Sequence, residues 1–344
     1  MDKVRVGIIG AGWAGSTHAE ALRYAPQAEL VAIADPRFNE TPPRGAAEKP
    51  GLADQYSVEA LFDAAALIHR PDINAVFIAS PHEFHKPQAV ACAQAGKHVF
   101  VEKPMATSVE DCQEMITACQ RANVRLMVGH FQRFREPAQA VKLVLESGTL
   151  GRVLMVQETM IEPSEGGWRN RPESRGVLLG YGVHSIDRIR WWMGCNVEAV
   201  CAFSAHFRGL SVEDGTQMLM RFTNGVQASL MCTDIWPVND PLSPGAVPAT
   251  SMILGEKGVL DINLYGDVRL AASGPWRTIA TLPKWDSPRA FERMRAYALQ
   301  ARDFIDAILQ DREPAITGQD GLAAVQVALA AYQASESSQW VCLE

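Results

Sequence analysis

Hydrophobic and polar residues follow two different periods along the chain, and the period changes once. Up to about residue 130, short apolar runs are separated by longer segments with helical spacing. The apolar runs are 4–10 (VRVGIIG), 30–35 (LVAIAD), 75–80 (AVFIAS), 98–104 (HVFVEKP) and 126–130 (LMVGH). Runs that are apolar throughout are typical of strands buried on both faces. This part of the chain therefore predicts a parallel sheet covered by helices and built from βαβ units.

The segments between these runs predict helices over 14–24, 85–96 and 108–123. The last of them begins with a Ser-x-x-Asp pattern, in which Ser108 is expected to cap the helix. The Pro- and Gly-rich segment 39–55 predicts a loop.

Beyond about residue 150 the period becomes that of half-buried strands. Apolar and polar residues alternate in 151–160, 197–207, 216–233 and 250–264, and tight-turn residues interrupt the last two. This predicts an open, mainly antiparallel sheet with one face to bury. Helical spacing returns in 289–310 and 320–335, and these helices pack either on that sheet or back on the first domain. We expect an α/β domain over 1–126 and an α+β domain over 127–344.

Composition narrows the class of protein. The 344 residues are 47% hydrophobic and 21% charged, which is ordinary for folded domains. The formal net charge is −7 and no basic stripe is present, which argues against nucleic acid and anionic membranes as partners. No apolar run approaches the roughly 20 residues that span a membrane, and the N-terminus has no signal-peptide layout. The seven cysteines form no CxxC pair and no metal-ligand spacing with histidine, so we expect no metal, reduced thiols and a cytoplasmic location.

Residues 10–15, GAGWAG, form a G-x-G-x-x-G turn between the first strand and the first helix. Gly10 allows a tight turn, Gly12 lets a pyrophosphate approach the backbone, and Gly15 lets the helix pack closely on the strand. Asp35 ends the next strand, where it is able to bind the ribose hydroxyls of NAD and to repel the 2′-phosphate of NADP. The pattern predicts a Rossmann domain that prefers NAD, although Arg37 nearby weakens the argument against NADP.

Polar residues follow two later strands at the edge where ligands bind in such sheets. Glu102-Lys103-Pro104 ends one strand, and a lysine there is suited to hold a substrate hydroxyl or to stabilise an alkoxide. Taken alone, the motif favours a surface lysine on a strand-end loop. Ser80-Pro81 ends the strand before it, where the nicotinamide ribose is expected to pass. His85 either caps the following helix or packs under the cofactor, and the structural role is favoured.

The stretch 178–192, LLGYGVHSIDRIRWW, places His184 where a helix is expected to begin. At a helix start the macrodipole disfavours a positive imidazole, so a neutral ring that accepts a proton is expected. From the residues alone, a catalytic base and a simple helix-start residue are equally supported. Asp187 is expected to do no more than favour the first turn, and Trp191-Trp192 to pack the helix on the sheet.

At this point the chain resembles a known family. AGWAGSTHAEAL, SPHEFHKP, AGKHVFVEKPMA, VGHFQRF and GYGVHSIDRIRWW occur in the order and spacing of the glucose–fructose oxidoreductase / inositol dehydrogenase (Gfo/Idh/MocA) family. The resemblance implies a Rossmann domain followed by an α+β domain whose open sheet forms the subunit interface, hence a homodimer or homotetramer. It also implies that Lys103 is the active-site lysine and that His184 is the catalytic acid/base.

The resemblance implies further contacts. The cofactor-binding residues would be Gly10, Gly12, Trp13, Ala14, Asp35, Ser80, Pro81, His85, Glu102, Lys103 and Arg169, and the substrate-binding residues Lys103, Trp168, Tyr181 and His184. Many members carry an aspartate four residues before the catalytic histidine, whereas this chain has Gly180. Orientation of the imidazole must then come from Tyr181, a backbone group or water.

We expect an NAD-dependent oxidoreductase that transfers a hydride between nicotinamide and a secondary hydroxyl of a sugar, inositol or related cyclic compound. One alternative is a dihydrodiol dehydrogenase of aromatic-acid metabolism, because the arginine-rich loop 168–175 would suit a carboxylate. Another is a dinucleotide sensor without turnover, which Gly180 favours and the retained Lys103 and His184 oppose. Glycosidic cleavage with tightly held NAD also occurs in the family, and no feature selects it.

Overall fold

The computed structural model describes residues 3–39, 51–162, 171–235, 249–282 and 291–343. The chain forms two compact units. Unit 1 comprises Met1–His130 and Tyr297–Leu322, and unit 2 comprises Phe131–Ala296 and Ala323–Glu344. The division at 126/127 stays a prediction.

Unit 1 contains the predicted parallel sheet. Its six strands are β1 (Val4–Ile9), β2 (Ala28–Ala34), β3 (Glu59–Leu61), β4 (Ala75–Ile78), β5 (His98–Val101) and β6 (Leu126–Val128). They lie in the order β3-β2-β1-β4-β5-β6, and every neighbouring pair is parallel. This is the strand order of a Rossmann fold, which confirms the prediction. The three-residue strand β3 was not predicted.

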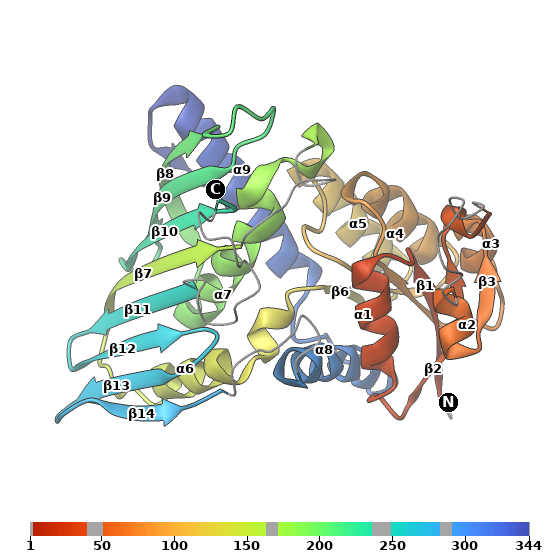
Figure 1. Ribbon diagram of the computed structural model, residues 1–344, viewed down its shortest axis with the longest axis horizontal. Helices are drawn as coiled ribbons and strands as arrows, with labels where there is room; N and C mark the ends of the chain where they lie inside the picture. The colour runs from red at the N-terminus through yellow and green to blue at the C-terminus, as the bar shows by residue number, and fades with distance from the viewer. Residues whose placement is uncertain (1–2, 40–50, 163–170, 236–248, 283–290, 344) are drawn as a thin grey trace, which may run out of the picture. The chain divides into compact units, whose positions relative to one another are not determined.

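The connections of unit 1 are largely helical, as expected (Figure 1). They include α1 (Trp13–Leu22), α2 (Leu52–Tyr56), α3 (Ala64–Ile68), α4 (His85–Gln94) and α5 (Val109–Arg121), with short 3₁₀ turns at Pro36–Asn39 and His82–Phe84. Ser108 caps α5 as predicted, because its side chain accepts a hydrogen bond from the Asp111 N–H at 3.1 Å. The loop predicted over 39–55 is wrong at Leu52–Tyr56, which is helical, and 40–50 lie outside the described residues.

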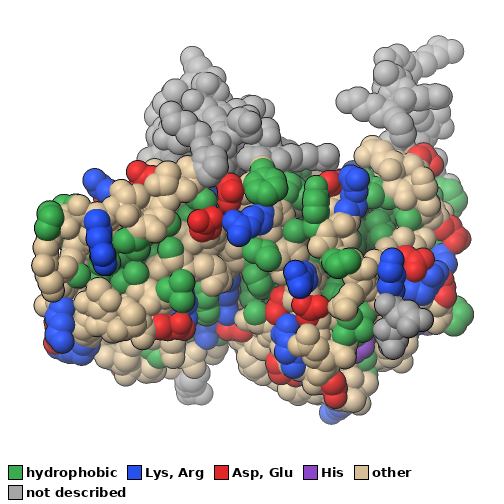
Figure 2. Space-filling view, turned by 90° about the horizontal axis from the view of Figure 1, so that it is seen from below, with side chains coloured by type: hydrophobic (Ala, Val, Ile, Leu, Met, Phe, Trp, Pro, Cys, Tyr) green, Lys and Arg blue, Asp and Glu red, His purple; other side chains and the backbone are tan. Residues whose placement is uncertain are grey.

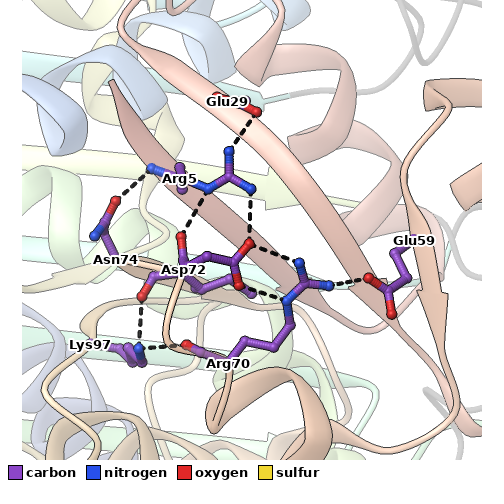
Figure 3. Close-up of polar contacts among 8 residues, drawn as sticks. Arg5, Glu29, Glu59, Arg70, Asp72, Asn74 and Lys97 are labelled. Atoms are coloured by element: carbon purple, nitrogen blue, oxygen red, sulfur yellow. Dashed lines mark hydrogen bonds and ion pairs between the residues drawn. The ribbon is translucent and has the colours of Figure 1, made fainter. Parts of the chain in front are cut away.

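An ion-pair network ties together the amino ends of these strands (Figure 3). Arg5 on β1 donates to Glu29 at the start of β2 and to Asp72 before β4, each at 2.8 Å. Arg70 donates to both carboxylate oxygens of the same Asp72, and Lys97 donates to the Arg70 carbonyl at 2.8 Å. The charges at this edge therefore satisfy one another, whereas the functional candidates follow the carboxyl ends of the strands.

Unit 2 is built on a nine-stranded sheet in the order β14-β13-β12-β11-β7-β10-β9-β8-β15. Its strands are β7 (Val153–Ile161), β8 (Val197–Ala205), β9 (Gly215–Phe222), β10 (Gln227–Thr233), β11 (Ala249–Gly255), β12 (Gly258–Asn263), β13 (Val268–Ala272), β14 (Arg277–Ala280) and β15 (Val341–Cys342). The sheet is mainly antiparallel, as predicted, but β7 and β10 pair in parallel. Residue alternation reports which face a side chain occupies and not the direction of the neighbouring strand, so the sequence could not reveal this pair.

Helices cover one face of this sheet (Figure 1). The helices are α6 (Glu136–Glu146), α7 (Val183–Met193) and the part of α9 (Gly318–Ser337) that belongs to unit 2. Helix α8 (Phe291–Leu309) begins in unit 2, and most of it belongs to unit 1. Alternate side chains of β7, β9 and β11 point away from the helices and are exposed, including Met155, Leu219 and Met252. The Trp192 indole donates to the Ala138 carbonyl of α6 at 3.0 Å, and packing of Trp191-Trp192 on the sheet stays a prediction.

Charged side chains of both signs are interspersed over the face drawn in Figure 2. No large region of that face carries a single sign of charge. Within the described residues, no helix is long and apolar enough to cross a membrane.

Candidate active site

The glycine turn of unit 1 has the geometry that its sequence predicts. Gly10 has φ +100°, and a Cβ there would lie 2.6 Å from the Ala79 carbonyl oxygen. A Cβ at Gly15 would lie 1.8 Å from the Gly10 carbonyl oxygen. Both positions therefore require glycine.

Gly12 shows that the turn fits a dinucleotide. It precedes α1, and the nearest atom to a Cβ at this position would be an Arg37 nitrogen at 3.9 Å. The backbone at the start of α1 is therefore open to a ligand, and the helix presents N–H groups and a positive dipole end to phosphates. Trp13 and Ala14 form the first turn of this helix.

Asp35 lies beside the glycine turn, one residue beyond β2. Its Oδ2 accepts a hydrogen bond from the Ala11 N–H at 2.7 Å, and the Arg37 guanidinium donates to both carboxylate oxygens at 2.8 and 2.9 Å. Burial raises the pKa of Asp35, but the bonds from Arg37 and Ala11 outweigh burial and hold it below its usual value. The carboxylate is ionised and is held at the edge of the turn.

His85, the first residue of α4, joins two loops at the carboxyl edge of the sheet. Its ring is fully buried, with Nε2 2.9 Å from the Ser80 carbonyl and Nδ1 3.0 Å from the Pro104 carbonyl. It therefore ties the loop that carries Ser80-Pro81 to the loop that carries Lys103. The predicted capping role is wrong, because His85 is the first residue of α4 and the helix has no side-chain cap. A cofactor contact of His85 stays a prediction.

Glu102 and Lys103 directly follow β5. The Lys103 N–H donates to Glu102 Oε2 at 3.1 Å, and His18 Nε2 lies 2.7 Å from Glu102 Oε1. Burial raises the pKa of Glu102, but the hydrogen bond with His18 and the charge on Lys103 outweigh burial and hold the pKa below its usual value. An ionised carboxylate is thus buried next to the candidate lysine.

Sequence reasoning missed His18 and His82. The His18 ring on α1 packs against the rings of Phe77 and Phe100, with centroids 5.4 and 4.9 Å away. The signal available was a histidine on the buried face of the helix that follows the glycine turn. Burial lowers the pKa of His82 well below its usual value, and the neighbouring His85 and Lys103 lower it further.

In unit 2, His184 is the second residue of α7, but it does not begin the helical run. A π-helical turn, Leu178–Gly182, precedes α7 without a break, and the run starts at Gly176. The expectation that His184 lies at a helix start, with the macrodipole argument built on it, is therefore wrong. The imidazole is 4% exposed and meets the Phe131 ring edge-on, with ring centroids 5.4 Å apart. π-Turns within helices are frequent at functional sites.

Tyr181 and Gly180 lie within the π-turn. A Cβ at position 180 would meet no atom within 4 Å among the described residues, so the local space would admit a side chain there. The missing aspartate is therefore not explained by crowding.

The residues after His184 are enclosed by charge partners. Asp187 is buried and accepts two hydrogen bonds from the Arg133 guanidinium, at 2.8 and 2.5 Å. The expectation that Asp187 only favours the first helical turn is therefore wrong. Arg188, which is also buried, pairs with Glu158 on β7.

Two site candidates, Trp168 and Arg169, lie outside the described residues. Of the loop arginines that follow, Arg175 adopts φ +62°, and its carbonyl accepts a hydrogen bond from the Tyr332 hydroxyl at 2.7 Å. Among the residues that can be described, no group of three or more His, Cys, Asp or Glu side chains is placed to hold a metal ion.

Comparison with known proteins covers nearly the whole chain. A model of an oxidoreductase family with an NAD-binding Rossmann fold matches residues 4–130, and the model of that family's C-terminal alpha/beta domain matches residues 142–343. A myo-inositol 2-dehydrogenase of Thermotoga maritima is 29% identical over 99% of each chain. A 1-carboxy-3-chloro-3,4-dihydroxycyclohexa-1,5-diene dehydrogenase of Comamonas testosteroni is 30% identical over 66% of this chain and 57% of its own. The structure of a levoglucosan dehydrogenase with NADH and levoglucosan superposes with a TM-score of 0.86, at 25% identity over 99% of each chain.

Proposed function

Because the chain belongs to the Gfo/Idh/MocA family of oxidoreductases, we propose that it transfers a hydride between NAD and a secondary hydroxyl of a sugar, inositol or related cyclic compound. The observation that carries this proposal is the carboxyl edge of the unit 1 sheet. The open glycine turn, the ionised Asp35 and the Glu102-Lys103 pair all follow strands at that edge. Ligands bind at this edge in open α/β sheets.

Each residue has a separate task in this proposal. The N–H groups at the start of α1 hold the pyrophosphate, and Asp35 binds the adenine ribose. Bound NAD supplies the nicotinamide that accepts or donates the hydride. Lys103 holds the substrate hydroxyl by a charge-assisted hydrogen bond, and the His184 imidazole takes the hydroxyl proton during oxidation. Glu102 balances the positive charge of Lys103 in a buried setting.

The test is NADH formation, followed by absorbance, across a panel of inositols, aldoses, anhydrosugars, sugar acids and carboxylated cis-dihydrodiols. We expect turnover of at least one polyol, with NAD preferred over NADP because of the Asp35 carboxylate. If NAD binds but nothing in the panel turns over, the sensor alternative replaces this proposal.

A second candidate substrate is a carboxylated cyclic diol. It is favoured by the Comamonas testosteroni relative, whose name denotes such a compound. Turnover restricted to the dihydrodiols, with none of the polyols oxidised, would select it over the first candidate.

We also propose that the open face of the unit 2 sheet joins two or more copies of the chain. Met155 and Leu219 on this face are 52% and 51% exposed, and Met252, Leu254 and Trp340 are exposed with them. A contiguous apolar patch of this kind on a sheet is typical of a protein interface.

Leu219→Glu is therefore expected to shift the mass measured by light scattering to that of a monomer. Leu143→Glu, at a 67% exposed leucine on α6 of the same unit, is the matched control and should leave the mass unchanged. A parent protein that is already monomeric at micromolar concentration would refute the interface.

We propose a cytoplasmic location on the basis of the thiols. All seven cysteines are free, and burial raises the pKa of Cys112 and Cys119 to about 12, which keeps them unreactive. A disulfide found by mass spectrometry of unreduced protein would count against this location.

A further inference from the structure

A buried carboxylate accepts hydrogen bonds from backbone N–H groups at the start of the helical run that carries His184. Glu213, which is 6% exposed, precedes β9. Its Oε2 accepts a hydrogen bond from the Val177 N–H and its Oε1 accepts one from the Leu178 N–H, each at 2.7 Å. Gly176 has φ +86°, and a Cβ there would lie 1.6 Å from Glu213 Oε2. Only glycine lets the chain wrap around this carboxylate.

Tyr332 on α9 completes the contact. Its hydroxyl oxygen lies 2.8 Å from Glu213 Oε1 and 2.7 Å from the Arg175 carbonyl, and it accepts the Leu179 N–H at 3.1 Å. The N–H groups of three successive residues, 177 to 179, are thus bound by two side chains from distant parts of the sequence. Such groups at a helix start lack partners within the helix, so these side chains anchor the run at its beginning.

Two contacts between oxygen atoms at this anchor each need a proton to form a hydrogen bond. The Arg175 carbonyl, the Tyr332 hydroxyl and Glu213 Oε1 form a row with contacts of 2.7 and 2.8 Å. A hydrogen bond needs one proton in each contact, and the phenol supplies only one. A proton on Glu213 supplies the other, so the neutral carboxyl satisfies the whole row.

The surroundings favour that proton. Burial raises the pKa of Glu213 to about 7, because it outweighs the hydrogen bonds with Leu178, Tyr332 and Val177, which lower the pKa; the negative charge of Asp234 adds to the rise. Burial also raises the pKa of Tyr332 well above its usual value, so the phenol keeps its proton. Among the described residues, the buried Cys232 thiol on β10 also interacts with Glu213, and burial raises the pKa of this thiol as well. Asp234 itself is paired with Arg208 at 2.5 Å.

We propose that Glu213 and Tyr332 are positioning residues for His184, and that the proton shared along this anchor holds the π-turn in the form that presents the imidazole. The proposal rests on the proposed function, in which His184 moves the proton. In this proposal the anchor orients the His184 imidazole in a chain that has Gly180 in place of the family aspartate.

The proposal sets the sign of a pH dependence. The neutral form of Glu213 predominates below about pH 7 and is lost as the pH rises through that value. The base His184 must be neutral, so activity rises with pH on the acid side. The pH profile of kcat is therefore expected to be bell-shaped, with Glu213 responsible for the fall on the alkaline side.

The experiment compares kcat over pH 5.5 to 9, roughly one to two units either side of the ionisation, in the parent, Glu213→Gln and Tyr332→Phe. Glu213→Gln cannot ionise, so it should lose the alkaline fall and keep the acid limb. Its kcat should be lower than that of the parent, because the amide NH2 cannot accept one of the two backbone N–H bonds. Tyr332→Phe should lower kcat about tenfold, the cost of one lost hydrogen bond, with little change in the KM for NAD. Ser335→Ala is the matched control, because it removes another α9 side-chain bond to a backbone N–H, that of Ser204 at 2.8 Å.

Amide hydrogen exchange of residues 177–179 tests the anchor without relying on turnover. At a fixed pH we expect exchange about tenfold faster in Tyr332→Phe than in the parent, and no change in Ser335→Ala. Unchanged exchange would overturn the anchor itself. If exchange is faster in Tyr332→Phe but the alkaline fall of kcat persists in Glu213→Gln, the anchor has only a structural role. That result would overturn the proposal. Faster exchange in a protein that turns over nothing would support the anchor while refuting the proposed function.

Discussion

His184→Ala is expected to lower kcat by about 10² to 10⁴, the usual contribution of a positioned acid/base group. The imidazole is nearly buried against Phe131 on a helix whose start is anchored, so its position is fixed by packing rather than by chance contact. The KM for NAD should change little, because the proposed contacts to the pyrophosphate and the adenine ribose belong to unit 1. The measurement is steady-state kinetics with the best substrate of the panel.

His206→Ala is the matched control, since His206 is an exposed histidine of the same unit and should leave kcat unchanged. Lys103→Ala should also lose activity, but with a higher KM for the polyol, because in the proposed function the lysine holds the hydroxyl in the ground state as well. Full activity in His184→Ala would mean that the proton leaves by another route and that His184 is only a helix residue.

The parts of the fold that the sequence predicted are those dictated by local constraints. The glycine turn was predictable because backbone atoms of Gly10 and Ala79 occupy the space of any larger residue. The alternation in unit 2 was predictable because one face of the sheet is buried and the other is not. The strand β3 was missed because its three residues, Glu59–Leu61, offer too short a pattern to detect.

The candidate site was predictable only in part, for a physical reason. Lys103 and His184 came from a family resemblance, since neither residue is identified by spacing alone. The partners that hold the site lie far away along the chain. Glu213 is 36 residues from Val177, and Glu102 is 84 residues from His18. Contacts of this kind depend on tertiary packing, so no local pattern in the sequence reports them.

Helix α7 shows the same limit. Asp187 and Arg188, which are charged, are as buried as Ile186 and Ile189 on the same helix. The helix is enclosed on nearly every side, and its polar residues are accommodated by ion pairs with other elements. The sequence of a helix does not show whether its charged residues are exposed to solvent or paired with a buried partner.

Arg188→Met is expected to destabilise unit 2 by about 3–5 kcal/mol. Arg188 pairs with Glu158, which accepts a further hydrogen bond from Ser251 at 2.6 Å, and Gln132 accepts another bond from Arg188. Removing the guanidinium leaves a carboxylate buried without its counter-charge, which is the costly step. Urea unfolding followed by tryptophan fluorescence measures the change, because Trp191 and Trp192 lie on the same helix.

The double variant Arg188→Met/Glu158→Gln separates two contributions to stability. One is the stabilisation that the intact ion pair provides, and the other is the cost of leaving one charge buried without its partner. Once both charges are gone, the buried-charge penalty disappears, so the double variant should be more stable than Arg188→Met alone. Arg152→Met is the matched control in the same sheet, since Arg152 and Glu256 form an exposed pair with side chains 70% and 46% accessible. That control should shift stability by less than about 1 kcal/mol. Equal losses of stability in Arg188→Met and Arg152→Met would mean that Arg188 is solvated in solution. Burial of α7 would then not explain how the helix that carries His184 is held in place.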